Sequence, residues 1–336
     1  MAPGDAQQLV DGFGRVHRDL RISVTDRCNF RCTYCMPEEG LQWLRRDEIL
    51  SFEEITRIAR VFVERFGVDS IRLTGGEPTV RAHLPVLVEQ LAALGVDLSM
   101  TTNGSTLRSQ ARDLADAGLR RINVSLDSLR RDRFLELTRR DELDRVLDGI
   151  QAAKEAGLDP VKVNVVLVGG VNDDEVVDFA RFGRDHDVTV RFIEFMPLDA
   201  DAGWQQGKVV PQVEILRRIG EVFPVEAVVR GSEPAERFRY LDRPGDRPGD
   251  VVGVIPSVTR PFCETCDRVR LTAEGQLRTC LFALDEHDLR GPLRAGGSDD
   301  ELAEVMRAAV GAKWAGHAIG QVQFIRPRKS MSQIGG

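Results

Sequence analysis

Apolar and polar residues alternate in six short segments within the first 200 residues of the chain. In residues 20–25, for example, every second residue is Leu, Ile or Val, and the residues between them are Arg, Ser and Thr. A period of two predicts β-strands with one apolar face. The predicted strands are residues 20–25, 70–74, 96–102, 121–127, 161–168 and 188–196.

Helical segments separate these strands. One helix is expected to begin at Ser51, because Glu54 follows three residues later and completes a capping box. The predicted helices are residues 51–66, 83–94, 107–117, helical material between 128 and 156, and 175–185. Regular alternation of strand and helix predicts a parallel sheet. Six units are too few to close an eight-stranded barrel, so we expect an α/β fold, a partial (βα)6 TIM-type barrel that is open along one side.

The polar face of the predicted strands carries positive charge. A parallel strand buried on both faces would be apolar nearly throughout, so the polar face should line a lumen. Arg21, Arg72 and Lys162 lie on this face. Buried cations need a counter-charge or water. Two interpretations remain open: the cations pair with lumen acids such as Asp127 and Glu194, or they await an anionic ligand, most simply a polyphosphate.

The pattern changes after residue 197. Two stretches rich in Gly, Asp, Arg and Pro predict loops, at 199–212 and 231–250. Helices are expected over 213–222 and 302–315, and short antiparallel strands between 223 and 281. We therefore divide the chain into a loose arm (1–14), the partial barrel (15–198) and a C-terminal region (199–336) that closes the open side.

Charge and hydropathy exclude some classes of protein. The chain has 336 residues, of which 46 are basic and 53 are acidic, a formal net charge of -7. This balance argues against a broad basic surface for nucleic acid. The sequence contains no run of about 18 apolar residues, and its first ten residues lack the apolar core of a secretory signal. We expect a cytoplasmic protein that binds neither nucleic acid nor membranes.

All six cysteines fall into two triplets, and the first directly follows the first strand. Cys28, Cys32 and Cys35 have the spacing C-x3-C-x2-C, which allows three thiolates to converge on one soft metal centre. Iron–sulfur clusters are usually held by four thiolates, so three would leave one iron open. Zinc is disfavoured because no histidine lies between His17 and His83, and a disulfide explains an odd number poorly. Zinc and inert core cysteines remain as alternatives.

The second triplet lies in the C-terminal region. Cys263, Cys266 and Cys280 have the spacing C-x2-C-x13-C. His287 could complete a Cys3His zinc site. We favour a second iron–sulfur cluster with an open iron, because the first triplet already implies loading with iron.

Three short motifs lie near these triplets. The Gly-Gly-Glu-Pro segment at 75–78 closes the second strand, and a Thr-Thr-Asn-Gly segment closes the third; each alone predicts only a turn. Arg268 and Arg270 share one face of a predicted strand, and a solvated edge remains an alternative interpretation of the pair. The two terminal glycines are typical of a frayed chain end.

The first triplet, with Tyr34 before its last cysteine, resembles the signature of the radical S-adenosylmethionine (SAM) superfamily. Within that superfamily, residues 15–336 resemble the family that cyclises GTP in the first step of molybdenum cofactor biosynthesis. The motifs that carry the closer resemblance are residues 25–35, 72–78, 123–128, 191–196 and 262–268, and the terminal Gly-Gly pair.

This resemblance implies two [4Fe–4S] clusters and SAM as cofactors. Cys28, Cys32 and Cys35 would hold the cluster that cleaves SAM, and Cys263, Cys266 and Cys280 the cluster that meets the guanine. The implied SAM contacts are Tyr34, Gly76, Ser125 and Met196. The implied GTP contacts are Arg21, Arg72, Thr101, Lys162, Arg268, Val269 and Arg270. The residues implied in catalysis are Arg268, Arg270, Gly335 and Gly336.

In the family's reaction, a 5′-deoxyadenosyl radical removes hydrogen from C3′ of GTP, and C3′ then bonds to C8 of guanine. The resemblance also implies an electron donor such as flavodoxin or ferredoxin, transfer of the product to cyclic pyranopterin monophosphate synthase, and a monomer or homodimer. Two alternatives remain: a radical SAM enzyme that modifies a peptide, and a non-catalytic zinc protein that binds nucleic acid.

Overall fold

The computed structural model describes residues 7–199, 203–229, 233–321, 324–327 and 329–335. Within these residues, twelve strands form one sheet in the order β12-β11-β10-β1-β2-β3-β4-β5-β6-β9-β8-β7. The strands are β1 (Asp19–Ser23), β2 (Ser70–Thr74), β3 (Asp97–Thr102), β4 (Arg121–Ser125), β5 (Val161–Leu167), β6 (Thr189–Glu194), β7 (Val225–Ala227), β8 (Glu236–Tyr240), β9 (Val251–Ile255), β10 (Arg268–Leu271), β11 (Gln276–Arg278) and β12 (His287–Asp288).

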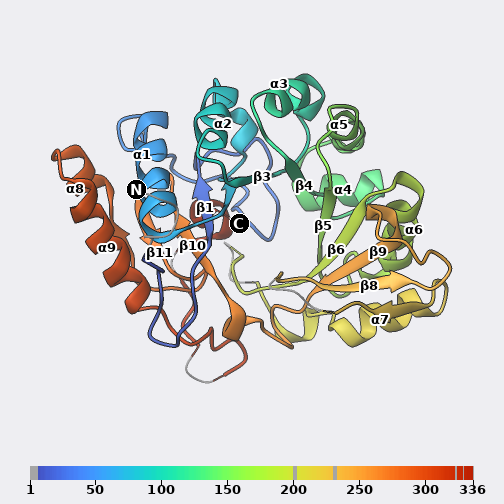
Figure 1. Cartoon of the computed structure of the whole chain (residues 1–336). Helices are drawn as coiled ribbons and strands as arrows, with labels where there is room; N and C mark the ends of the chain where they lie inside the picture. Colours follow the sequence, from blue (N-terminus) through green and yellow to red (C-terminus); the bar gives the residue numbers. More distant parts are fainter. Residues whose placement is uncertain (1–6, 200–202, 230–232, 322–323, 328, 336) are drawn as a thin grey trace.

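Helices surround the convex side of this sheet, and the strands curve around a hollow that is open on one side (Figure 1). The helices are α1 (Phe52–Phe66), α2 (Leu84–Ala92), α3 (Ala111–Asp116), α4 (Arg131–Thr138), α5 (Leu143–Glu155), α6 (Val176–His186), α7 (Gln212–Gly220), α8 (Arg290–Arg294), α9 (Asp299–Gly311) and α10 (Met331–Ile334). None of these described helices is long and apolar enough to cross a bilayer.

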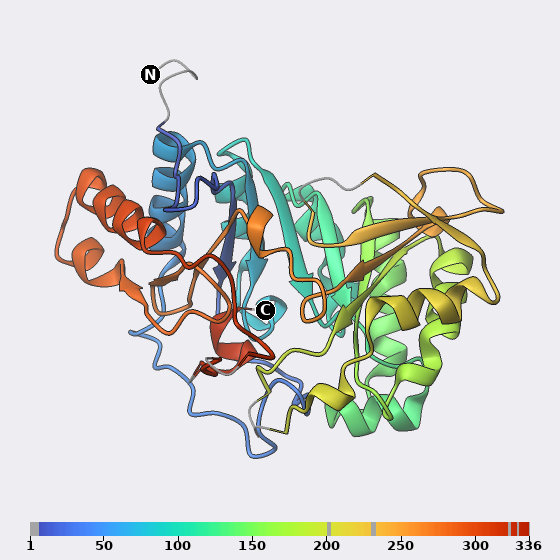
Figure 2. The same cartoon turned by 90° about the horizontal axis from the view of Figure 1, so that it is seen from below.

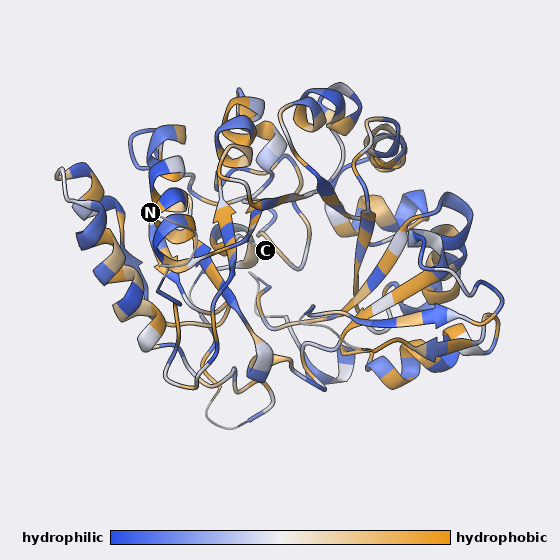
Figure 3. Ribbon diagram, in the orientation of Figure 1, coloured by the Kyte–Doolittle hydropathy of each residue, from blue (hydrophilic) through white to orange (hydrophobic). Residues whose placement is uncertain are grey.

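The six predicted strands are confirmed as β1 to β6, each within two residues of its predicted limits. They pair in parallel in chain order. Their apolar positions, such as Leu20 and Ile22, are fully buried and pack under the helices, where hydrophobic residues gather (Figure 3). The capping box at Ser51 is also confirmed, because the Glu54 amide donates to Ser51 Oγ at 3.2 Å.

The expectation of only antiparallel strands between 223 and 281 is wrong for two of them. β9 pairs in parallel with β6, and β10 pairs in parallel with β1. These strands satisfy the free N–H and C=O groups that the six-stranded sheet would otherwise leave on its two outer strands. The C-terminal region therefore extends the parallel sheet at both ends before the antiparallel strands begin.

Two further expectations need correction. The predicted loop 231–250 contains β8, whose Phe238 and Tyr240 are buried, because alternation within this short segment prevails over its Gly- and Pro-rich flanks. The described part of the predicted loose arm is folded: Leu9 is 1% exposed, and Val10 forms a β-bridge with Val16. Leu9 is held because its carbonyl accepts the His17 amide at 2.8 Å.

The C-terminal segment returns to the middle of the molecule. Figure 2 shows α10 beside the strands that surround the hollow, far in sequence from the elements around it. The backbone of Gly335 is so close to β1 and β2 that a Cβ there would lie 2.6 Å from Thr74 Oγ1 and 3.2 Å from Ser23 Cβ. Its φ of +77° also favours glycine. The last described residue, Gly335, therefore lies against the inner face of the sheet.

Candidate functional site

One cavity on the inner face of the sheet is lined by all six cysteines. The first triplet lies on the loop after β1, and the second follows β9 and β11. The two are brought together because β10 lies beside β1, with Arg268 opposite Asp19 in the register. Cys266 lies just before β10 and Cys280 just after the antiparallel β11, so the second triplet lies at the edge where β1 begins, whereas the first triplet follows the end of β1. The two triplets therefore line one hollow from opposite edges of the sheet.

The loop of the first triplet is held in a fixed shape. Two backbone amides, of Cys35 and Met36, donate to the carbonyl of Cys32 at 2.9 and 3.0 Å, and the Thr33 amide donates to Leu137 at the end of α4. Burial raises the pKa of the Cys28 thiol to about 12 and that of Cys35 to about 11. Buried thiols of this kind become anionic ligands only when a metal displaces the proton.

The donor set suits an iron–sulfur cluster better than a single ion. Among the described residues, no group of three or more His, Cys, Asp or Glu side chains is placed to share one metal ion. The thiolate ligands of a cluster bind different irons, so they do not need to meet at one point. His287, the candidate fourth ligand of a zinc site, lies on β12 and does not line the cavity. His317 lines it instead, and sequence reasoning missed this residue.

The two glycines after β2 are required by the first cysteine loop. A Cβ on Gly75, whose φ is +153°, would lie 2.6 Å from the Thr25 carbonyl oxygen, and one on Gly76 would overlap the carbonyl oxygens of Asp26 and Arg27. The Gly76 amide donates to Thr25 at 2.8 Å. Close packing of two loops, in addition to any approach by a ligand, therefore explains these glycines.

Glu77, beside these glycines, ties the loops after β2 and β3 together. Its buried carboxylate accepts hydrogen bonds from the Thr102 hydroxyl at 2.6 Å and the Asn103 amide at 2.6 Å, and burial raises its pKa. The Asn103 side chain in turn donates to the side chain of Asn29 at 2.8 Å. Asn29 lies between two cysteines of the first triplet in the sequence. The segment after β3 is therefore more than an isolated turn.

The alternative in which the lumen cations pair with Asp127 and Glu194 is wrong. Asp127 accepts the Tyr34 hydroxyl at 2.5 Å and the Val166 amide at 2.8 Å. Glu194 accepts the Gln212 amide at 3.1 Å and further donors from Val258 and Thr259. Both acids are satisfied by neutral donors, and the cations remain available for another partner.

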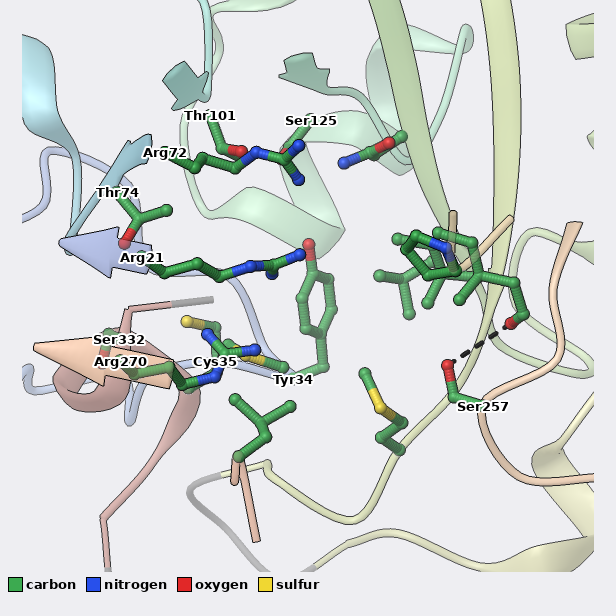
Figure 4. Close-up of a pocket in the computed structure, with 18 of the residues that line it drawn as sticks. Arg21, Tyr34, Cys35, Arg72, Thr74, Thr101, Ser125, Ser257, Arg270 and Ser332 are labelled. Carbon is green, nitrogen blue, oxygen red and sulfur yellow. Dashed lines mark hydrogen bonds between the residues drawn. The ribbon is translucent and has the colours of Figure 1, made fainter. Parts of the chain in front are cut away.

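Three arginines stand side by side on adjacent strands. Arg270 of β10 is opposite Arg21 of β1, which is opposite Arg72 of β2. Their side chains extend in the same direction into the cavity (Figure 4). Burial lowers the pKa of Arg21 and Arg270 to about 9 and that of Arg72 to about 10. We call these three residues the arginine row.

Two more arginines complete the positive lining. Arg268 lies 3.8 Å from Asp19, which also lies 3.8 Å from Arg21. Arg191 lines the cavity and donates to Asn164 at 2.9 Å and Asn123 at 2.8 Å. It belongs to a motif that the sequence singled out, but its role was not predicted. Within the described residues, no carboxylate forms an ion pair with Arg72, Arg191 or Arg270, so the cavity has an excess of positive charge.

The structure brings most of the other predicted residues to this cavity. Its lining includes Tyr34, Gly76, Thr101, Ser125 and Met196.

Two predicted GTP contacts lie outside the main cavity. Val269 is fully buried in the core. Lys162 lines a second hollow that shares Arg191 with the main cavity, and its Nζ lies 3.9 Å from Glu233. Gly335 accepts a hydrogen bond from Arg270, and Gly336 is outside the described residues.

Burial of Asp127 predicts a pH dependence of stability in the iron-free chain. Burial raises the pKa of Asp127 from 3.8 to about 6, so the folded chain binds this proton more tightly than the unfolded chain. Stability should therefore fall as pH rises from about 4 to about 7, by up to about 3 kcal/mol from this group. In the Asp127→Asn variant, the free energy of unfolding should fall less over the same pH range.

Denaturant unfolding at both pH values measures the effect, with Asp141→Asn as a control, since Asp141 forms an exposed ion pair with Arg131. Parallel pH profiles for the wild-type chain and Asp127→Asn would contradict the assignment of this proton.

Comparison with known proteins agrees with this geometry. The model of the Radical SAM superfamily matches residues 22–183, and the model of Molybdenum Cofactor Synthesis C matches residues 188–319. Among solved structures, SuiB of Streptococcus suis bound to S-adenosylmethionine has a TM-score of 0.57 at 14% identity, covering 87% of this chain and 68% of SuiB. At this identity the likeness concerns the fold alone, and it confirms the partial barrel.

Similar curated sequences span the whole chain. The GTP 3′,8-cyclase of Streptomyces coelicolor is 51% identical over 98% of this chain and 97% of the relative. The GTP 3′,8-cyclase of Mycolicibacterium smegmatis is 48% identical over 100% of this chain and 93% of the relative. With both family models and full-length relatives in agreement, the chain belongs to the GTP 3′,8-cyclase family of the radical SAM superfamily.

Proposed function

We propose that this chain converts GTP to (8S)-3′,8-cyclo-7,8-dihydroguanosine 5′-triphosphate, the first step of molybdenum cofactor biosynthesis. The observation that carries this proposal is the shared cavity: both cysteine triplets and the arginine row line it. A protein that modifies a peptide has no evident need for three adjacent buried arginines, whereas a triphosphate supplies the anion that they lack.

The first triplet, together with the residues around it, forms the SAM side of the cavity. Cys28, Cys32 and Cys35 would hold a [4Fe–4S] cluster, which with SAM bound supplies the 5′-deoxyadenosyl radical. Tyr34, locked by Asp127, together with Gly76, Ser125 and Met196, would hold SAM against this loop. These residues come from loops after several different strands, which fits a ligand at the C-terminal edge of a parallel sheet.

The positive side of the cavity holds the substrate. Arg21, Arg72 and Arg270 would bind the triphosphate, with Arg268 and Arg191 beside them. Lys162 would extend this binding into the second hollow. Guanidinium groups bind phosphate oxygens in pairs, and their fixed orientation aligns the ribose.

The second triplet would hold a [4Fe–4S] cluster near the guanine. Fixing the triphosphate at one end and the base at the other leaves C3′ as the position that faces SAM. C3′ of GTP loses its hydrogen atom to the radical, and the C3′ radical then adds to C8 of the same bound nucleotide. The resulting nucleotide radical takes up one electron from the reductant and one proton to give the 7,8-dihydro product. The backbone of Gly335, held by Arg270, would close the cavity against water.

The remaining proposals concern the cellular setting. We propose that the enzyme acts in the cytoplasm as a monomer or homodimer and receives electrons from a donor such as flavodoxin or ferredoxin. Its product would pass to cyclic pyranopterin monophosphate synthase.

An anaerobic assay with GTP labelled with deuterium at C3′ tests the proposed function. Chain reconstituted with iron and sulfide is mixed with SAM and dithionite, and the products are followed by mass spectrometry. We expect deuterium in 5′-deoxyadenosine and cyclised nucleotide in an amount equal to the deuterated 5′-deoxyadenosine. ATP in place of GTP should give no cyclised nucleotide and no deuterated 5′-deoxyadenosine. Formation of 5′-deoxyadenosine without deuterium, and without a nucleotide product, would refute the cyclase activity.

A further inference from the structure

A buried lysine lies behind the second cysteine triplet. Lys313 follows the end of α9 and is 4% exposed. Its Nζ lies 2.8 Å from His17 Nε2, 2.8 Å from the Arg268 carbonyl oxygen, and 3.5 Å from Cys266 Sγ. The carbonyl oxygen of Cys266 also lies 3.4 Å away. One amino group thus joins the N-terminal segment, the second triplet and the start of β10.

The geometry uses every donor of the ammonium group. A protonated lysine has three N–H groups and no acceptor. One donates to His17, one to Arg268, and the third is directed to Cys266. Because Lys313 can only donate, Nε2 of His17 accepts, and the proton of the neutral imidazole lies on Nδ1.

The histidine is itself held in place by its surroundings. His17 is fully buried, and its backbone amide donates to the Leu9 carbonyl at 2.8 Å. The Asp11 carboxylate lies 3.6 Å from Nε2 but does not bond to it, because Nε2 accepts from Lys313. That carboxylate is already occupied by the Arg15 guanidinium at 2.6 Å. Arg15 in turn donates to the carbonyl of Cys263 at 2.6 Å. The folded N-terminal segment is therefore connected to two of the three cysteines, to Cys263 through Arg15 and to Cys266 through Lys313. Of these two cations, Lys313 is the one that contacts a sulfur atom.

No carboxylate forms an ion pair with Lys313 among the described residues. Burying an ammonium group is costly unless an anion compensates it. The anion that fits is the thiolate of Cys266, which is charged when it binds a metal centre. Hydrogen bonds and positive charge at a ligand sulfur stabilise the reduced, more negative state of an iron–sulfur cluster.

We propose that Lys313 is a positioning residue for the second cluster. It donates to the Cys266 thiolate and raises the reduction potential of the cluster held there. Through the Arg268 carbonyl it also fixes the ligand sulfur relative to β10, the strand that carries Arg268 and Arg270. The proposal rests on the proposed function only in that the second triplet holds a cluster.

The test uses the full chain with Cys28, Cys32 and Cys35 replaced by alanine, so that iron is present only at the second triplet. In this parent protein, EPR-monitored titration with dithionite gives the potential of the second cluster. We expect Lys313→Met to shift the potential to more negative values. Lys313→Arg keeps the charge, so its potential should stay close to that of the parent. Lys329→Met is the matched control, because Lys329 pairs with Glu274 and Glu286 instead; it should leave the potential unchanged.

A second measurement needs no Lys313 variant, and so remains decisive if Lys313→Met fails to fold. With lysine labelled with ¹⁵N, the reduced parent should show a ¹⁵N coupling by pulsed EPR, which backbone amides such as that of Phe282, a donor to Cys280, cannot give. Absence of that coupling, or equal potentials for parent and Lys313→Met, would overturn the proposal while leaving the cyclase function intact. A parent chain that holds no cluster at the second triplet would overturn both.

Discussion

Replacing Cys32 with alanine is expected to abolish 5′-deoxyadenosine formation while leaving the second triplet loaded with iron. Cys32 is the middle ligand of the first triplet, and its carbonyl also organises the turn that places Cys35. Two remaining thiolates hold a [4Fe–4S] cluster poorly, so iron should fall from about eight to about four atoms per chain. The measurements are iron and sulfide analysis and 5′-deoxyadenosine after reduction with dithionite.

The matched control is Cys263→Ala, which removes one ligand of the other triplet. This variant should lose a similar amount of iron but should still cleave SAM, because the first triplet is intact. It should make little cyclised nucleotide, since GTP would no longer be fixed by its base. Normal cyclisation by Cys263→Ala would show that the second triplet does not place the substrate, and SAM cleavage by Cys32→Ala would contradict the role of the first.

Replacing Arg21 with methionine should weaken GTP binding and stabilise the ligand-free chain. Arg21 is the middle member of the arginine row, between Arg270 and Arg72. A charge-assisted contact with phosphate contributes about 2–3 kcal/mol, so GTP affinity should fall on the order of 100-fold. Without GTP, the buried guanidiniums repel each other, and removing one should raise the free energy of unfolding by about 1–2 kcal/mol.

Calorimetry with GTP measures the affinity, and denaturant unfolding without GTP measures the stability. Arg57→Met is the control, because Arg57 on α1 pairs with Asp299 away from the cavity; it should leave GTP affinity unchanged and should not stabilise the chain. The two effects of Arg21→Met have opposite signs, which separates ligand binding from general damage to the fold. Unchanged GTP affinity would remove Arg21 from the substrate site.

The parts of the molecule that follow from local pattern were predictable. Alternation identified β1 to β6 and assigned Arg21 and Arg72 to the inner face, because the period of a strand decides which side a residue faces. Cysteine spacing identified the first triplet, since three thiols within eight residues have few other purposes, and the second was assigned to iron because of the first. These features depend on neighbours in the chain, so the sequence carries them directly.

The parts that depend on distant segments were not predictable. β10 pairs with β1 across about 250 residues, and no local signal distinguishes that arrangement from an antiparallel hairpin. The Tyr34 hydroxyl donates to Asp127, just after β4, so an acid that was one candidate partner of the lumen cations is already occupied. Arg191 and His317 line the cavity because the curvature of the sheet places their segments there, and the sequence does not show this curvature.

β9 and β10 lie late in the sequence, and this has a consequence for synthesis of the chain on the ribosome. The first 200 residues contain β1 to β6, but their outer strands find partners only in residues 251–255 and 268–271. A nascent or truncated chain would expose unpaired backbone that invites association with other copies. Fragments ending near residue 200 should therefore aggregate, and co-expression of residues 201–336 would be needed to keep them in solution.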